Sequence, residues 1–253
     1  MPEKFKNERE RIRIISLLVD VCDTRSAVDH IENLIGRGAF IACANVHMTM
    51  EAADDPDFAA MVNSADLIVA DGKPIAVMQR KLGKKNARQI RGYDLMIGLL
   101  RFAAKNNIKV GIFGGSKETL AAYQKRAESD FAGINIVYSF SPPFIPGEMP
   151  LNPQTIADIN ASQAELLFVA LGCPKQEKWM AKNRESLSAV QIGVGAAVDF
   201  YAGTAAKAPE SLQRIGLEWL FRLYKEPKRL WRRYLLNNPR FVYRAVRRLL
   251  TKK

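Results

Sequence analysis

The chain has 253 residues, of which 48% are hydrophobic and 25% charged, and this composition excludes a disordered or collagen-like protein. Of its net charge of +12, +11 lies in residues 219–253, which hold 12 Lys or Arg and a single acid, Glu226. An almost neutral body therefore precedes a basic tail. Such a concentration of charge indicates an anionic partner: phosphate, anionic lipid or nucleic acid.

The cysteines and the first residues indicate the cellular compartment in which we expect the protein. Cys22, Cys43 and Cys173 are far apart and show no CxxC spacing, so we expect free thiols in a reducing environment and no zinc site. The first residues, MPEKFKNERERIR, are charged throughout and lack the apolar region of a secretory signal. No stretch approaches the roughly 18 apolar residues that span a bilayer. We therefore expect a cytoplasmic protein that does not cross a membrane.

Short apolar segments that end in polar residues or glycine alternate with segments of helical period. The expected strands are 12–19, 40–44, 66–70, 108–113, 134–138, 165–171 and 189–194. The expected helices are 26–35, 92–106, 117–130, 153–161 and 174–185, with Ser26 and Ser116 as N-caps and Pro153 and Pro174 in first turns. This alternation predicts a Rossmann-like α/β fold: a mostly parallel sheet with helices on both faces and a functional crevice at the carboxyl ends of the strands.

Two segments depart from this alternation. Residues 139–150 contain four prolines and a glycine, so we expect a loop there. From residue 212 onward the pattern becomes helical and basic, and Pro227 and Pro239 divide it into about three pieces. We therefore predict an α/β catalytic domain, 1–211, followed by a basic helical appendage, 212–253.

The end of this appendage has the pattern of an amphipathic helix that lies on a membrane surface. Apolar and basic residues both recur there at helical spacing: Val242, Val246 and Leu249, and Arg240, Arg244 and Arg247 or Arg248. Each basic residue near an anionic leaflet contributes about 1 kcal/mol of binding free energy. We therefore expect the protein to associate peripherally with the inner face of the cell membrane.

Unusual residues gather at the ends of the expected strands. They are Asn45, His47, Asp71, Gly72, Gly114, Gly115, the run Gly172 to Glu177, and Gly195. Gly114 and Gly115 either form a tight turn or, with the helix start at Ser116, cradle a phosphate. Neither GxGxxG nor GxxxxGK[ST] occurs, so the sequence supports neither a dinucleotide fingerprint nor a P-loop.

Asp71 is the strongest candidate for a general base, because it ends an apolar strand and a glycine follows it. Partial burial there would raise its proton affinity. The alternatives remain open: Asp71 could cap the next helix, Asp199 could be a cap or a cavity residue, and His47 could be a base or a structural hydrogen-bonding residue. Asp55–Pro56–Asp57 matches the DxD pattern of metal sites, but its setting favours a helix cap, and no metal site is expected.

Taken together, the segments resemble the WecG/TagA/CpsF glycosyltransferase family from about residue 15 to the C-terminus. The resemblance is carried by NVHMTM, ADLIVADGKPI, RGYDLM, VGIFGGS, LFVALGCPKQEKWM, IGVGAAVDFYAG with KAPE, and GLEWLFRLYKEPKRLWRRYL. It implies an inverting, metal-independent enzyme without a cofactor, which transfers a sugar from a UDP donor to an undecaprenyl-diphosphate-linked sugar during the synthesis of teichoic acid, common antigen, capsule or exopolysaccharide. The sugars and the oligomeric state, including a homo-oligomer, stay open.

The resemblance also implies roles for individual residues. Asp71 falls on the family's base, and Asn45 and Gln176 on its other catalytic positions. Donor or phosphate contacts are expected at Gly114, Gly115, Gly172, Gly195 and Asp199. Acceptor contacts are expected at Cys43, which stands where many members have threonine, and at His47, Arg91, Arg222, Arg229, Arg232 and Arg233. Arg88 is an alternative to Arg91.

Two other classes of protein are consistent with parts of the sequence. The basic tail and its aromatic residues would suit a nucleic-acid-binding protein, but the α/β body carries almost no net charge and the chain contains no recognisable nucleic-acid motif. A nicotinamide-dependent oxidoreductase is disfavoured by the missing glycine fingerprint. We therefore expect a sugar transferase with a UDP-sugar, a lipid-linked acceptor and an anionic membrane surface as partners, and no nucleic acid.

Overall fold

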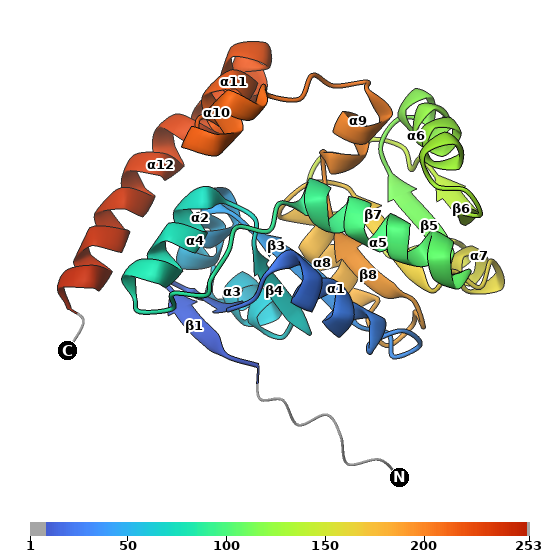
Figure 1. The fold of residues 1–253 in the computed structure, drawn as a ribbon, viewed down its shortest axis with the longest axis horizontal. Coiled ribbons are helices and arrows are strands. Elements are labelled where there is room, and N and C mark those ends of the chain that lie inside the picture. Colours follow the sequence, from blue (N-terminus) through green and yellow to red (C-terminus); the bar gives the residue numbers. More distant parts are fainter. Residues whose placement is uncertain (1–8, 252–253) are drawn as a thin grey trace, which may run out of the picture.

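Six of the expected apolar segments form one parallel sheet in the computed structural model, which describes residues 9–251 (Figure 1). The strand order is β4-β3-β8-β7-β5-β6. Five strands are buried along their whole length or nearly so, whereas β6 at the edge is only partly buried. The strands are β3 (Phe40–Ala44), β4 (Leu67–Ala70), β5 (Lys109–Gly114), β6 (Asn135–Phe140), β7 (Leu166–Ala170) and β8 (Val190–Gly193).

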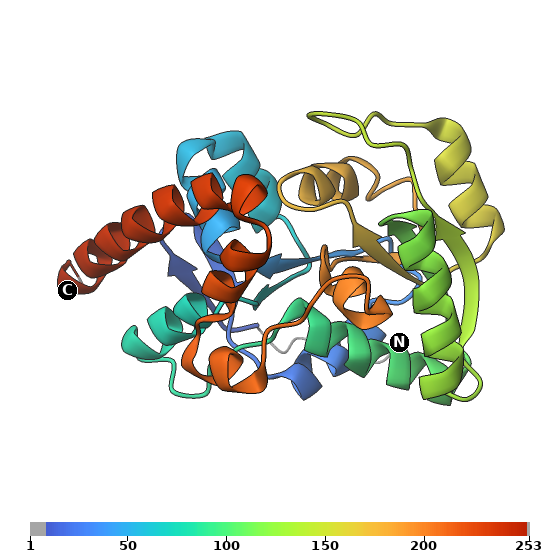
Figure 2. The ribbon, with the colours of Figure 1, turned by 90° about the horizontal axis from the view of Figure 1, so that it is seen from above.

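Helices cover both faces of this sheet because alternate strand residues point to opposite sides. Ile41 and Cys43 pack against one layer, made of α1 (Thr24–Glu32), α5 (Gly92–Asn106), α6 (Lys117–Asp130) and α9 (Ala197–Ala202). Phe40 and Ala42 pack against the other, made of α2 (Val46–Asp54), α3 (Pro56–Asn63), α7 (Pro153–Ala161) and α8 (Lys175–Lys182). Figure 2 shows the two layers on either side of the sheet. The predicted α/β class is confirmed.

The prediction of a single strand over residues 12–19 is wrong. The segment forms an antiparallel hairpin of β1 (Arg11–Ile14) and β2 (Leu17–Asp20), with a turn at Ile15, whose φ is 57°. A β-branched residue rarely adopts positive φ, so no local pattern indicates a turn at this position. Asn63 of α3 fixes the hairpin: its side chain accepts a bond from the Leu18 amide (2.7 Å) and donates one to the Ser16 carbonyl (3.0 Å).

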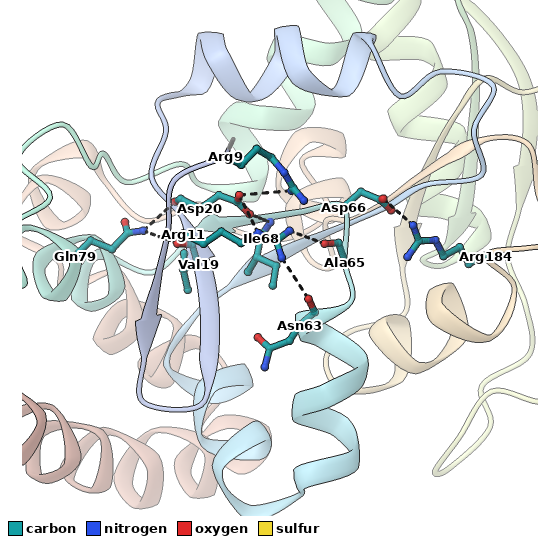
Figure 3. A network of polar contacts seen from close by, with 10 residues as sticks. All are labelled: Arg9, Arg11, Val19, Asp20, Asn63, Ala65, Asp66, Ile68, Gln79 and Arg184. Carbon is teal, nitrogen blue, oxygen red and sulfur yellow. Dashed lines mark hydrogen bonds and ion pairs between the residues drawn. The ribbon is translucent and has the colours of Figure 1, made fainter. Parts of the chain in front are cut away.

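A polar network attaches this hairpin to the edge of the sheet (Figure 3). The buried carboxylate of Asp20 accepts hydrogen bonds from the Ile68 amide of β4 (2.8 Å) and from Arg11 (3.2 Å). Gln79 of α4 (Lys73–Lys81) donates to the Asp20 carbonyl (2.9 Å). The hairpin therefore covers β4, which would otherwise be an open edge of the sheet.

Two of the predicted helix starts need correction. Asp23 is the N-cap of α1, and Ser26 completes a capping box by accepting a bond from the Asp23 amide (3.0 Å), so Ser26 is not the cap itself. Pro174 is the N-cap residue of α8 rather than part of its first turn. Ser116 caps α6 and Pro153 begins α7, as predicted.

Three helices follow the α/β body: α10 (Glu210–Ile215), α11 (Glu218–Lys225) and α12 (Pro227–Leu250). We call them the appendage. The predicted domain boundary between residues 211 and 212 falls inside α10, and the division into domains stays a prediction. The longest helix, α12, packs against α2 (Figure 1). Its buried residues Phe241 and Ala245 belong to the same core as the body, and Arg240 pairs with Asp54 of α2 (2.5 Å).

The prediction that Pro239 divides the tail is wrong, because α12 runs through it. A proline inside a helix removes one backbone hydrogen bond. Here the helix contacts the body on both sides of that position: Asn237 hydrogen-bonds to His47 of α2 (3.1 Å), and Phe241 is buried in the core of the body. Packing against the body therefore outweighs the local preference.

The outward face of α12 differs in part from the predicted apolar stripe. Val242 and Val246 are exposed as expected, but Leu249 packs against the core, and Leu250 is exposed instead. Lys252 and Lys253, at the end of the predicted stripe, lie outside the described residues, as do residues 1–8 of the charged start. Within residues 9–251, no helix is both long and apolar enough to cross a membrane.

Candidate active site

A cavity of about 920 Å³ lies at the carboxyl ends of the strands and is bordered on its other side by the appendage. Most of the predicted site residues line it. They are Cys43, Asn45, His47, Asp71, Arg91, Gly172, Gln176, Gly195, Asp199, Arg222, Arg229, Arg232 and Arg233. The residues that line it include eight Lys or Arg and five Asp or Glu, so the cavity suits an anionic ligand.

Asp71 follows β4, and its carboxylate lies beside the start of α5. Oδ1 accepts a hydrogen bond from the Gly92 amide at 2.8 Å. The pKa of Asp71 is raised to about 6, mainly by burial and also by the charge of Glu218, against the lowering effect of bonds from Gly92 and Asn45 and of the charge of Arg222. The first turn of α4 is capped by Gly72, without a side-chain bond, so Asp71 is not its cap. The Asp71 carboxylate lines the cavity, where it can act on a ligand.

Asn45 reaches Asp71 because β3 and β4 end side by side, with Ala44 opposite Ala70. The Asn45 side-chain oxygen caps α2 by accepting from the Met48 amide (3.2 Å), and its side chain also hydrogen-bonds to Asp71. A Cβ at Gly72 would lie only 3.3 Å from Cα of Asn45. Glycine is therefore needed for the two strand ends to approach this closely.

Gly114 and Gly115 do not line the cavity. Gly114 has a φ of 114°, and a Cβ there would lie 2.5 Å from the carbonyl oxygen of Ala170 on the neighbouring strand. Gly115 also has a positive φ, of 80°, and Ser141 donates to its carbonyl oxygen (2.7 Å). These contacts give both glycines a role in the turn, whereas the phosphate contact stays a prediction.

Gln176 is held at both ends of its amide group. Its oxygen accepts from the Gly172 amide (3.1 Å), and its nitrogen donates to the carboxylate of Glu177 (2.8 Å). A Cβ at Gly193 would lie 2.9 Å from that nitrogen, so β8 needs a glycine beside Gln176. Gln176 therefore fixes the turn after β7, and its position at the cavity leaves one amide hydrogen for a ligand.

Glu177 is fully buried next to this glutamine, and the sequence reasoning gave it no role. Burial raises its pKa, while hydrogen bonds from Gln176 and from the Cys173 thiol and the charge of Arg233 lower it. Its second oxygen, Oε2, has no hydrogen-bond partner. A buried carboxylate with one unsatisfied oxygen is costly, so the positive charge of Arg233 is important here. A glutamate that follows a cavity residue gives no sequence signal of this burial.

His47 is in the first turn of α2 and contacts α12. Its Nδ1 is 3.1 Å from the Asn237 side-chain nitrogen and 3.4 Å from Glu51. Burial and the charge of Arg233 lower the pKa of His47 to about 4, so it is neutral at pH 7. A neutral imidazole can accept a hydrogen bond from Asn237, which gives His47 a structural contact with the appendage in addition to its place in the cavity wall.

The appendage arginines line the wall that faces Asp71. Arg222 stacks over the ring of Phe200 at 5.2 Å, and Arg229 pairs with Glu226 (2.6 Å). The Nε atoms of Arg222 and Arg233 are buried without a hydrogen-bond partner. Buried guanidinium donors that lack partners are costly unless a ligand satisfies them. These side chains are therefore well placed to receive the oxygens of an anionic group.

Arg91, rather than Arg88, lines the cavity. Arg91 pairs with Asp94 (2.6 Å) and donates to the side chain of Gln213 in α10. Arg88 instead donates to the carbonyls of Lys85 and Ala87. Arg91 thus connects the body to the appendage at the edge of the cavity.

Sequence reasoning gave no role to several further charged residues of the cavity, among them Lys207 and Glu218. Lys207 lies 3.6 Å from the centre of the Tyr93 ring, and Glu218 begins α11. Both fall within segments that carried the family resemblance, KAPE and GLEW, but no local pattern distinguishes them from surface charges. Asp199 lies on the same side and accepts a bond from Thr119 (3.1 Å).

The arrangement places a carboxylate that can accept a proton opposite a wall of arginines that suits an anionic group. Asp55 caps α3 by accepting from the Asp57 and Phe58 amides (both 3.0 Å), which confirms the helix-cap interpretation of the DxD pattern. Within residues 9–251, no group of three or more His, Cys, Asp or Glu side chains could hold a metal ion.

Comparisons with known proteins identify this combination. The model of the Glycosyl transferase WecG/TagA/CpsF family matches residues 12–253. An N-acetylglucosaminyldiphosphoundecaprenol N-acetyl-beta-D-mannosaminyltransferase from Bacillus spizizenii is 35% identical over 222 residues, which cover 86% of this chain and 83% of the relative. The protein with the same name from Bacillus subtilis strain 168 is 30% identical over 217 residues, which cover 85% of this chain and 82% of the relative.

Proposed function

This chain belongs to the WecG/TagA/CpsF family of glycosyl transferases, and we propose that it transfers a sugar from a UDP-sugar to an undecaprenyl-diphosphate-linked sugar. The observation that carries the proposal is the position of Asp71: a carboxylate with a raised pKa faces arginines of the appendage across one cavity. The carboxylate suits a hydroxyl, and the arginines suit a diphosphate. The pathway would be the synthesis of a cell-surface polysaccharide.

The proposed reaction is a single displacement that inverts the anomeric carbon. Asp71 removes the proton from the acceptor hydroxyl while that oxygen forms a bond to the anomeric carbon of the donor. The bond between this carbon and the phosphate oxygen breaks on the opposite face, and UDP leaves with the electron pair. Asn45 and the Gly92 amide hold the Asp71 carboxylate in place during the transfer.

Cationic side chains would offset the charge that develops on the leaving diphosphate. Arg91 and Lys207 approach the cavity from the body, and Arg222 approaches it from the appendage. We propose that Arg229, Arg232 and Arg233 hold the diphosphate of the acceptor, because the planar guanidinium can bind two oxygens at once. No cofactor is needed, and turnover should survive an excess of EDTA. A strict requirement for Mg²⁺ or Mn²⁺ would overturn this part of the proposal.

The names of the relatives suggest which pair of substrates to test first. Both relatives are named for the transfer of N-acetylmannosamine to N-acetylglucosaminyldiphosphoundecaprenol. We propose the same pair for this chain, with the nucleotide part of the donor as UDP.

A peripheral position on the inner face of the cell membrane would bring the cavity to this lipid-linked acceptor. Supporting features lie at the end of α12, where Val246 and Leu250 are exposed and Arg247 and Arg248 carry positive charge. Apolar contact and attraction to anionic lipid together can hold such a helix in the interface.

The proposal is tested by a screen of UDP-sugars with purified protein, in which UDP release is measured with and without a short-chain N-acetylglucosaminyl diphosphate acceptor. UDP-N-acetylmannosamine should give acceptor-dependent release together with a disaccharide product. The product's anomeric configuration, opposite to that of the donor, would support inversion. Acceptor-independent hydrolysis alone, with every donor, would contradict the proposed transfer.

A further inference from the structure

A second hollow lies on the appendage, away from the active-site cavity. It is an apolar groove of about 490 Å³ between α11 and α12, lined by Trp219, Tyr234, Leu235, Asn238, Pro239, Val242 and Tyr243. The rings of Trp219 and Tyr234 lie 5.7 Å apart where the two helices meet. None of the lining residues is charged, although the helix that forms most of the groove is rich in arginine.

The side chains that border this groove are exposed rather than covered by the rest of the described chain. Leu235 is 55% exposed, Val242 60% and Tyr243 69%. Large apolar side chains grouped around a hollow mark a binding site more often than scattered single ones do. The apolar side chains around the groove therefore suit an apolar ligand.

The groove adjoins the active-site cavity across α12. Arg232 and Leu236 line the cavity, and Tyr243 lines the groove. Leu236 and Tyr243 are seven residues apart, so they lie on the same side of the helix. Both are more than half exposed, and they form an apolar ridge from the mouth of the cavity to the groove. From Arg232 to Val242 the helix rises by about 15 Å.

We propose that the groove binds the first isoprenoid units of the acceptor's lipid chain. This inference rests on the proposed function, in which appendage arginines hold the acceptor diphosphate. In a diphosphoundecaprenol the chain is bonded directly to that diphosphate, so it leaves the cavity where the arginines are. The ridge of Leu236 and Tyr243 then leads the chain to an uncharged groove, where burial of apolar surface favours binding.

In this proposal, the cavity and the groove make separate contributions to the binding free energy of the acceptor. Cavity residues recognise the sugar and the diphosphate, and groove residues recognise the chain. An acceptor with an isoprenoid chain should therefore bind more tightly than one without, even when no membrane is present. A groove that merely touches the bilayer surface would give no such difference in solution.

The test uses two acceptors with the same head group, the N-acetylglucosaminyl diphosphate esters of farnesol and of methanol, at concentrations below micelle formation and without vesicles. The variant L235S/V242S removes apolar surface at two exposed positions, so its folding should be unchanged. The control I215S makes the same kind of change at a residue of α10 that is 64% exposed and lines neither the groove nor the cavity.

We expect L235S/V242S to raise the KM for the farnesyl acceptor about tenfold, equivalent to about 1.4 kcal/mol, and to leave kcat and the KM for the methyl acceptor unchanged. I215S should match the wild type with both acceptors. Equal changes in KM for the two acceptors, or no change for either, would overturn the proposal.

Failure of the proposed function gives a different result. If the wild-type protein transfers no sugar to either acceptor, the groove is tested by calorimetry with farnesyl diphosphate and inorganic diphosphate. The proposal then requires that the wild type binds farnesyl diphosphate about tenfold more tightly, and that L235S/V242S loses this preference. Equal affinities of the wild type for the two ligands would refute the groove as an isoprenoid site.

Discussion

Replacement of Asp71 by asparagine should lower turnover and raise the stability of the folded protein. Asparagine keeps the shape of the side chain and can still accept a hydrogen bond from Gly92, but it cannot take the acceptor's proton. Turnover should therefore fall by roughly 10² to 10⁴, the usual contribution of a general base. At the same time, the substitution removes a buried charge, so the protein should become more stable near neutral pH.

The size of the stability change follows from the pKa of Asp71. Burial raises this pKa from 3.8 to about 6. The folded state thus binds more protons than the unfolded state between about pH 4 and pH 6, and the wild-type protein loses stability as the pH rises through this window. A shift of about two units corresponds to about 3 kcal/mol, an upper value for the gain in the asparagine variant at pH 8. The gain should vanish near pH 4.

The assay compares urea unfolding of wild type and D71N at pH 4.5 and pH 8, together with kcat/KM between pH 5 and pH 8. Wild-type kcat/KM should rise with pH, reach half of its plateau near pH 6 and level off at higher pH, because the base must be ionised. D66N is a matched control: Asp66 precedes the same strand, but it pairs with Arg184 (2.7 Å) and lies outside the cavity. D66N should be less stable than the wild type and keep its pH profile.

Two results would refute this reasoning. If D71N retains more than about half of wild-type turnover, Asp71 is not the base. If D71N is no more stable at pH 8 than at pH 4.5, relative to the wild type, the wild-type Asp71 carboxylate is solvated in the folded protein and its pKa is near the ordinary value.

Three further predictions concern the appendage. R233A should raise the KM for a short-chain diphosphate acceptor by roughly 10- to 100-fold, as expected for a lost hydrogen bond to a charged group. Initial rates measure this KM, and an unchanged KM would place the diphosphate elsewhere. F241A should lower the free energy of unfolding by about 3–5 kcal/mol, because Phe241 is buried in the core that α12 shares with the body; denaturant unfolding measures it, and a loss below about 1 kcal/mol would contradict this packing. R247S/R248S should weaken flotation with anionic vesicles at low salt and leave turnover on a soluble acceptor unchanged; equal flotation of variant and wild type would argue against an electrostatic membrane contact.

The fold and the position of the cavity could be predicted because short apolar segments of the sequence show where each strand begins and ends. An apolar run such as 67–70 shows where a buried strand ends, and parallel strands end at the same edge of the sheet. Asn45 and Asp71 could therefore be placed together before any coordinates were known, and the structure confirms that they meet. The family comparison confirms the resemblance that the motifs indicated.

Predictions from the sequence were wrong where contacts between distant segments determine the backbone conformation. Ile15 occupies a turn that its own preferences disfavour, because Asn63 of α3 binds both sides of that turn. Pro239 lies within α12 although proline usually ends a helix, because the helix packs along the body on both sides of it. In both places the free energy of tertiary contacts exceeds a local cost of a few kcal/mol, and no window of sequence contains both partners.

The electrostatics of the cavity were beyond sequence reasoning for a related reason. Gln176 and Glu177 are neighbours, yet the first lines the cavity and the second is buried behind it with an unsatisfied oxygen. The positive charge of Arg233 adds to the hydrogen bonds that lower the pKa of Glu177, and it adds to burial in lowering the pKa of His47. Removal of the appendage would take this charge away and leave the buried Glu177 carboxylate with its hydrogen bonds from Gln176 and Cys173 alone. The helices that we propose to bind the lipid-linked acceptor therefore also influence the protonation of the body's own residues, and the body alone should not retain the active site that the whole chain forms.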